Sequence, residues 1–71
     1  MNVTVIQADS EWVVLEASID GAPAATQRRS ISAAALAAGS LTLADEKAAL
    51  MTDVQAAYTR WLAVQQALQT I

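Results

Sequence analysis

The chain has 71 residues, enough for one domain, and combines an apolar fraction of 55 % with only 15 % charged residues. The absence of cysteine excludes disulfide bridges and thiolate metal sites, and a net charge of −3 argues against nucleic acid as a partner. An ordinary soluble domain carries about 25 % charged residues. We therefore expect part of the surface to be buried in an assembly.

The N-terminal sequence MNVTVIQADS has neither a basic segment nor an apolar core, so we do not expect it to act as a secretory signal peptide. The longest charge-free run, residues 30–44, is shorter than the roughly 20 apolar residues that a membrane helix needs. These features favour a virion or host-cytoplasmic location without contact to a membrane.

Two segments near the N-terminus have the composition of β-strands. Residues 3–8 (VTVIQA) are rich in β-branched side chains, and residues 12–20 (WVVLEASID) alternate apolar with polar side chains. The sequence DSE between them is expected to form a three-residue loop. Residues 20–23 (DGAP) predict a turn with GAP as its loop, because glycine accepts a positive φ and proline interrupts strand pairing. A third, weaker strand is expected over about residues 24–31.

These loops define a register for a three-stranded antiparallel meander, in which Glu16 lies opposite Arg28. One face then carries the apolar side chains of Val3, Val5, Val13, Leu15, Ala17, Ile19, Ala25 and Ile31. The other face carries Glu16, Ser18, Asp20, Thr26 and Arg28, together with Ile6, Ala8, Trp12 and Val14. A shift of one residue would exchange the two faces.

Helical signals follow the third strand. Residues 32–39 (SAAALAAG) are predicted to form a short helix, with Ser32 as its N-cap and Gly39 directly after its C-terminus. Thr42, followed three residues later by Asp45, is similar to a capping box at the start of a second helix. Neither glycine nor proline occurs after this point, so the second helix is predicted over residues 42–71.

An apolar position recurs along this long helix at alternating spacings of four and three residues. This set of positions, here termed the helix seam, is apolar except at Lys47 and comprises residues 43, 47, 50, 54, 57, 61, 64, 68 and 71. Met51, Tyr58 and Leu62 widen the seam on one flank. The line on the opposite side of the helix is wholly polar and consists of Asp45, Thr52, Thr59 and Gln66.

The length of the seam exceeds what a small sheet can cover. A helix over these residues would be about 43 Å long at 1.5 Å per residue. Strands of about seven residues reach only about 23 Å. We expect the proximal part of the seam to pack on the chain's own sheet and the distal part, Val64, Leu68 and Ile71, to meet another subunit. Parallel pairing, antiparallel pairing and a fold-back of the short helix onto the seam all remain open.

Enzymatic chemistry has little support in the sequence. Without histidine or cysteine, a nucleophile or general base would have to be Ser, Thr, Asp, Glu, Lys or Tyr. Asp45, Glu46 and Asp53 are interpreted as helix-start charges on a solvated face. No phosphate-binding loop, metal-ligand cluster or nucleophile motif is present. We predict a non-enzymatic protein without catalytic residues, cofactor, metal or small-molecule substrate.

Two further features allow more than one interpretation. Arg28 and Arg29 are read as charges on a solvated strand edge, with a salt bridge to a partner as the alternative. Trp12 either covers the end of the core or anchors an interface beside Val14 and Ile6. The predicted protein interface combines the seam with this sheet patch and consists of Trp12, Val14, Val54, Tyr58, Trp61, Val64, Leu68 and Ile71.

The order of elements, VVLEASIDGAPAATQRRSIS followed by the Ala-rich ADEKAALMTDVQAAYTRWLAVQQAL, resembles small accessory structural proteins of tailed bacteriophages. This resemblance implies a tail, baseplate or head-decoration subunit that binds itself or other virion proteins. The alternative is a small regulator or inhibitor, such as a host-defence antagonist or antitoxin-like protein, that binds one protein partner. The predicted fold is α+β: a single domain, 1–71, with a three-stranded β-meander, a short helix and a long amphipathic C-terminal helix.

Overall fold

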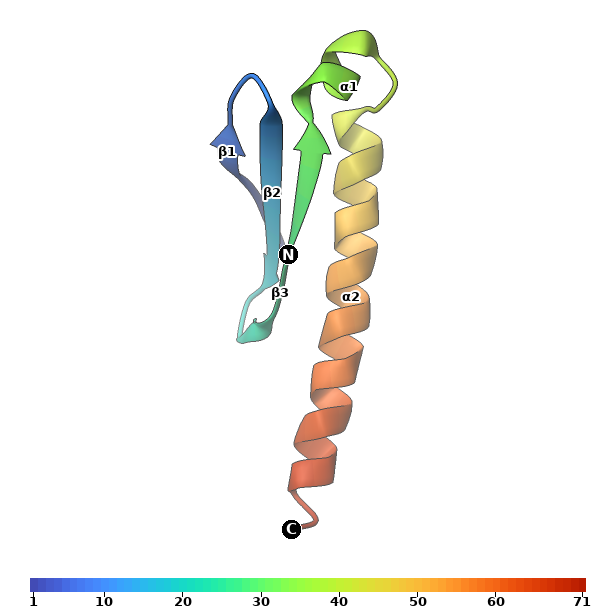
Figure 1. Cartoon of the computed structure of the whole chain (residues 1–71). Coiled ribbons are helices and arrows are strands. Elements are labelled where there is room, and N and C mark those ends of the chain that lie inside the picture. Colours follow the sequence, from blue (N-terminus) through green and yellow to red (C-terminus); the bar gives the residue numbers. More distant parts are fainter.

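The computed structural model describes all 71 residues, Met1–Ile71, and contains three strands followed by two helices (Figure 1). The elements are β1 (Asn2–Ala8), β2 (Trp12–Ile19), β3 (Ala22–Ser32), α1 (Ala33–Ala38) and α2 (Leu43–Leu68). The strands form one antiparallel sheet in the order β1-β2-β3. The predicted α+β fold is thus confirmed.

The inner part of the sheet has the predicted register. Val5 lies opposite Leu15 across β1 and β2, and Glu16 lies opposite Arg28 across β2 and β3. The Nε of Arg28 donates a hydrogen bond to Glu16 Oε2 over 2.8 Å. The face that Leu15 shares is the buried one, and its buried strand residues are Leu15, Ala17, Ala22, Ala25 and Ile31.

The β1–β2 pairing departs from the prediction close to its loop. The register shifts by one residue between Val5 and Gln7, so that Ala8 lies opposite Val13. Ala8 therefore shares the face of Val13, and the prediction that it lies on the same face as Trp12 is wrong. A bulge of this kind inserts one unpaired residue into one strand, which the alternation of side chains does not reveal.

The turn between β2 and β3 is also shorter than predicted. Residues 20–21 make the turn, with Gly21 at φ = 81°, and Ile19 pairs directly with Ala22. The predicted GAP loop is wrong, because β3 already begins at Ala22. The next ladder pair joins Ala17 to Gln27, so four residues of β3, 23–26, lie opposite the single residue Ser18 of β2. Pro23, which has no N–H to donate, falls in this irregular segment.

The helices begin at the predicted caps. The Ser32 hydroxyl caps α1, and Gly39 follows α1 at φ = 79°, a conformation that favours glycine. The Thr42 hydroxyl accepts a hydrogen bond from the Asp45 N–H over 3.2 Å at the start of α2. α2 ends at Leu68, so the predicted extension to residue 71 is too long.

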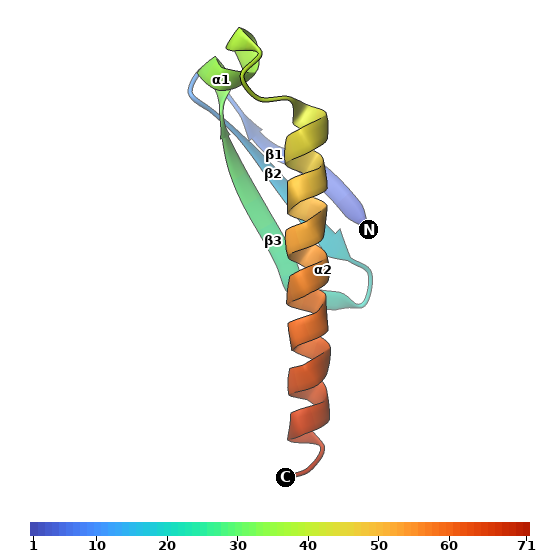
Figure 2. The same cartoon turned by 90° about the vertical axis from the view of Figure 1, so that its right-hand side faces the viewer.

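α2 packs against β3 and β2 on one face of the sheet and makes few contacts with β1 (Figure 2). The main core contains buried residues from both layers: Leu15, Ala17, Ile31, Leu50 and Val54. A second cluster, Ala22, Ala25 and Ala57, continues it towards the β2–β3 turn. The small side chains of this cluster let the helix lie close to β3 at that end.

The molecule is elongated. Its extents are 51 × 18 × 16 Å, and its radius of gyration of 14.7 Å exceeds the value of about 11 Å for a compact chain of this length. Both views show the last turns of α2 running past the β2–β3 turn without a strand beside them (Figure 1 and Figure 2). Neither helix combines the length and the apolar character needed to cross a membrane.

Candidate protein interface

Arg29 and Glu46 connect the sheet to the helix. Arg29 lies opposite Leu15 in the ladder and therefore points to the side of the sheet that α2 covers. Its Nε donates a hydrogen bond to Glu46 Oε2, and this hydrogen bond raises the pKa of Arg29 above its ordinary value. Asp53 Oδ2 lies 3.8 Å from Arg29 Nη1. The ion pair is therefore part of the fold.

The interpretations of Glu46 and Arg29 change as a result, because Arg29 was predicted to be a charge on a solvated strand edge. Glu46 is buried, so the prediction of a solvated helix-start charge is wrong for this residue. The cause is that β3 passes below the first turns of α2, where Arg29 meets the carboxylate. Arg28 points to the other face of the sheet and pairs with Glu16. Both arginines thus have carboxylate partners within the chain.

The proximal part of the helix seam belongs to the core of this chain. Val54 is fully buried between α2 and the sheet, so its assignment to a protein interface is wrong. Tyr58 and Trp61 are half-buried, and their rings stack with centroids 5.9 Å apart. Both rings pack against the alanine cluster at the end of the sheet. They therefore mark the point where the sheet's cover of α2 ends.

The distal part of α2 is free of the sheet. Residues 62–68 are here termed the helix tail, in which Val64 is 53 % and Leu68 55 % exposed. Arg60 is the last charged side chain, so the tail presents only apolar and neutral polar groups. Ile71 is also exposed, but it lies beyond the end of α2 and is not part of the seam's helical line.

The sheet patch lies on the face away from α2. Trp12 is 47 % exposed there, and together with Val14, Gln7 and Ser30 it lines a shallow groove of about 280 Å³. Val14 itself is half-buried. Because Trp12 pairs with Ser32 and shares the face of Glu16, it does not cover the core between sheet and helix. Of its two predicted roles, the interface role is the one that this position allows.

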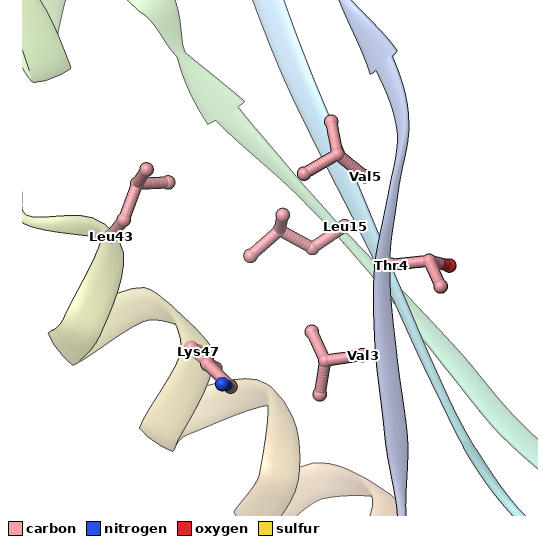
Figure 3. Close-up of a pocket in the computed structure, with 6 residues that line it drawn as sticks. All are labelled: Val3, Thr4, Val5, Leu15, Leu43 and Lys47. Atoms are coloured by element: carbon pink, nitrogen blue, oxygen red, sulfur yellow. The ribbon is translucent and has the colours of Figure 1, made fainter.

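A second groove was missed by the sequence analysis. It lies between β1 and the first turns of α2, has a volume of about 210 Å³, and is lined by Val3, Thr4, Val5, Leu15, Leu43 and Lys47 (Figure 3). Val5 is 58 % exposed although it shares the apolar face with buried Leu15. Figure 3 shows Val3 and Val5 on the helix side of β1 and Thr4 pointing away from the groove. This feature is termed the β1 groove.

The width of a helix explains why the β1 groove is open. Neighbouring strands lie about 4.8 Å apart, and a helix with its side chains is about 10 Å wide. One helix therefore covers about two strands, and the third strand of this sheet is left bare. This relation between one helix and three strands could have predicted the groove from the order of elements alone.

Neither groove carries an evident chemical centre. No three His, Cys, Asp or Glu side chains come close enough together to hold a metal ion. The chain matches no protein-family model, no curated protein and no solved structure. The surface features that distinguish the molecule are thus the helix tail, the β1 groove and the Trp12 patch.

Proposed function

We propose that this protein is a non-enzymatic assembly subunit that self-associates through its helix tail. The observation that carries the proposal is that α2 continues past its own sheet while keeping an apolar line. Val64 and Leu68 follow Leu50 and Val54 at spacings typical of one helix side, so they point to the side that is buried nearer the N-terminus.

Exposure of this line to water is unfavourable. Removal of a Val or Leu side chain from water is worth about 1.5–3 kcal/mol when burial is complete. Val64 and Leu68 are each about half exposed, and no charged residue follows Arg60 in the sequence. An interface that covers the tail would recover this free energy. A second copy is the partner that the assembly proposal requires.

A narrower proposal concerns the kind of assembly. The resemblance in element order and composition to small accessory proteins of tailed phages supports a virion component, such as a tail, baseplate or head-decoration subunit. The Trp12 patch would give each copy a second contact surface on the opposite face of the sheet, as a ring or lattice subunit needs. Purification of intact particles followed by mass spectrometry tests this narrower proposal, and particles without this chain would contradict it.

A charge-insertion experiment tests the role of the tail. In the variant with Val64→Glu and Leu68→Glu, we expect the oligomer to dissociate while the circular dichroism spectrum of the folded chain is kept. The matched control carries Thr59→Glu and Gln66→Glu, which add the same charge to the exposed polar side of α2. The control should remain associated. Equal dissociation of both variants, or of neither, would contradict the proposal.

A further inference from the structure

The chain leaves two surfaces uncovered, and each lacks the kind of element that the other provides. The β1 groove is a strip of sheet without a helix above it, and the helix tail is a stretch of helix without a sheet below it. The two surfaces lie at different ends of α2, since Leu43 lines the groove and Leu68 ends the tail. At 1.5 Å per residue these ends are about 38 Å apart, so a straight tail cannot reach its own groove.

The shape of the β1 groove suits the apolar side of one helix. Its floor is provided by Val3 and Val5 on β1, and its wall by Leu43 and Lys47 on α2. Met51 follows Lys47 by one helical turn, lies on the same flank and is exposed. The flank of α2 towards the groove is therefore largely apolar, and a helix above β1 would contact both the sheet and α2.

We propose that the helix tail of a second copy occupies the β1 groove. The inference rests on the proposed function and specifies the surface to which the tail binds. Because each copy has one tail and one groove, two copies in antiparallel orientation can exchange tails across a two-fold axis. Such an interface uses the same surfaces on both copies, as is common for dimers.

The exposed area of the chain agrees with such an exchange. A compact monomer of 7.4 kDa is expected to expose about 4,200 Å², whereas this chain exposes 4762 Å². The excess is therefore roughly 560 Å² per copy. One partner of a specific interface buries about 600–1,000 Å², so the excess is close to the lower end of that range.

The charges of the two surfaces permit contact between like molecules. Each copy carries a net charge of −3, so contact through acidic regions would be unfavourable. The helix tail carries no charge, and Lys47 is the sole charged residue that lines the groove. The carboxylate of Asp53 points instead to the side of Arg29. The proposed contact therefore places no carboxylates against each other.

Site-specific cross-linking tests this inference, because the natural chain has no cysteine and each variant would carry a single thiol. A Val5→Cys chain with ¹⁵N label and an unlabelled Leu68→Cys chain are mixed in denaturant, refolded together and treated with a short bismaleimide. Mass spectrometry then separates the mixed product from the two homodimers. The matched control replaces Val5→Cys by Thr4→Cys, whose side chain points away from the groove.

The expected result is a mixed Val5→Cys/Leu68→Cys product, formed several-fold more than the mixed product with Thr4→Cys. A predominance of Leu68→Cys homodimers would overturn the inference but keep the proposed function, because the tails would then pack on each other. A predominance of Val5→Cys homodimers would show pairing of β1 edges and also overturn the inference. No cross-linked product from a chain that is monomeric in solution would overturn both.

Discussion

Arg29 on β3 provides every ion pair between the sheet and the helix, with Glu46 as its hydrogen-bonded partner and Asp53 at 3.8 Å. Glu46 is the one buried charged residue of the chain. A buried carboxylate that loses its partner keeps the cost of its desolvation. The position of α2 on the sheet therefore depends on this pair as well as on apolar packing.

The neighbouring arginine supplies a comparison. Arg29→Met should lower the urea midpoint of unfolding clearly more than Arg28→Met, because Arg28 forms an exposed pair with Glu16 that contributes little. Each variant removes one positive charge from the same strand. Equal midpoints for the two variants would contradict the role assigned to Arg29.

Asp9 in the β1–β2 loop should make the free energy of unfolding depend on pH in the acidic range. Three hydrogen bonds to the carboxylate lower the pKa of Asp9. The backbone N–H groups of Trp12 and Glu11 donate to Asp9 Oδ1 over 2.7 and 2.8 Å, and the side-chain amide of Gln7 donates to Oδ2. Because the pKa of Asp9 is lower in the folded chain than its ordinary value of 3.8, the ionised carboxylate stabilises the fold at pH values above 3.8. This contribution is lost as the pH falls through the pKa that Asp9 has in the folded chain.

Asp9→Asn tests this dependence. The variant should lose stability relative to the natural chain at neutral pH, and the difference should shrink as the pH falls below 3.8. Thermal unfolding of both chains over a pH series measures this difference. A constant difference across the series would show that the charge of Asp9 is not responsible.

The main core can be tested at one turn of α2. Leu50 is fully buried, and Leu50→Ala should cost about 2–5 kcal/mol of unfolding free energy. Thr52 lies two residues away on the exposed side, and Thr52→Ala should change stability by less than about 0.5 kcal/mol. If Leu50→Ala leaves too little folded protein, Leu50→Val gives a smaller loss to measure. Similar values at positions 50 and 52 would contradict the packing of α2 on the sheet.

The elements of the fold could be predicted because their signals are local. Alternation of side chains marks β2, and the caps Ser32 and Thr42 mark the starts of both helices. The β2–β3 connection was harder to predict from the sequence. Gly21 and Pro23 are both turn signals, and the sequence does not show that Gly21 alone completes the turn while Pro23 belongs to an irregular strand.

The candidate interface was predicted only in part, because the helix seam does not reveal where the sheet ends. Val54 and Leu68 occupy equivalent positions of the seam, but Val54 is fully buried and Leu68 is exposed. Acidic residues are common at helix starts, so the sequence likewise did not indicate that Glu46 is buried against a partner 17 residues away on β3. Such assignments require the path of β3 beneath α2, which is a tertiary property.

The absolute mass of the purified chain in solution tests the proposed self-association most directly. Light scattering over a concentration series should give a fixed multiple of 7.4 kDa that persists on dilution. That result would agree with burial of the helix tail between copies. A stable monomer of 7.4 kDa across the series would contradict self-association and favour a small regulator that binds a different protein.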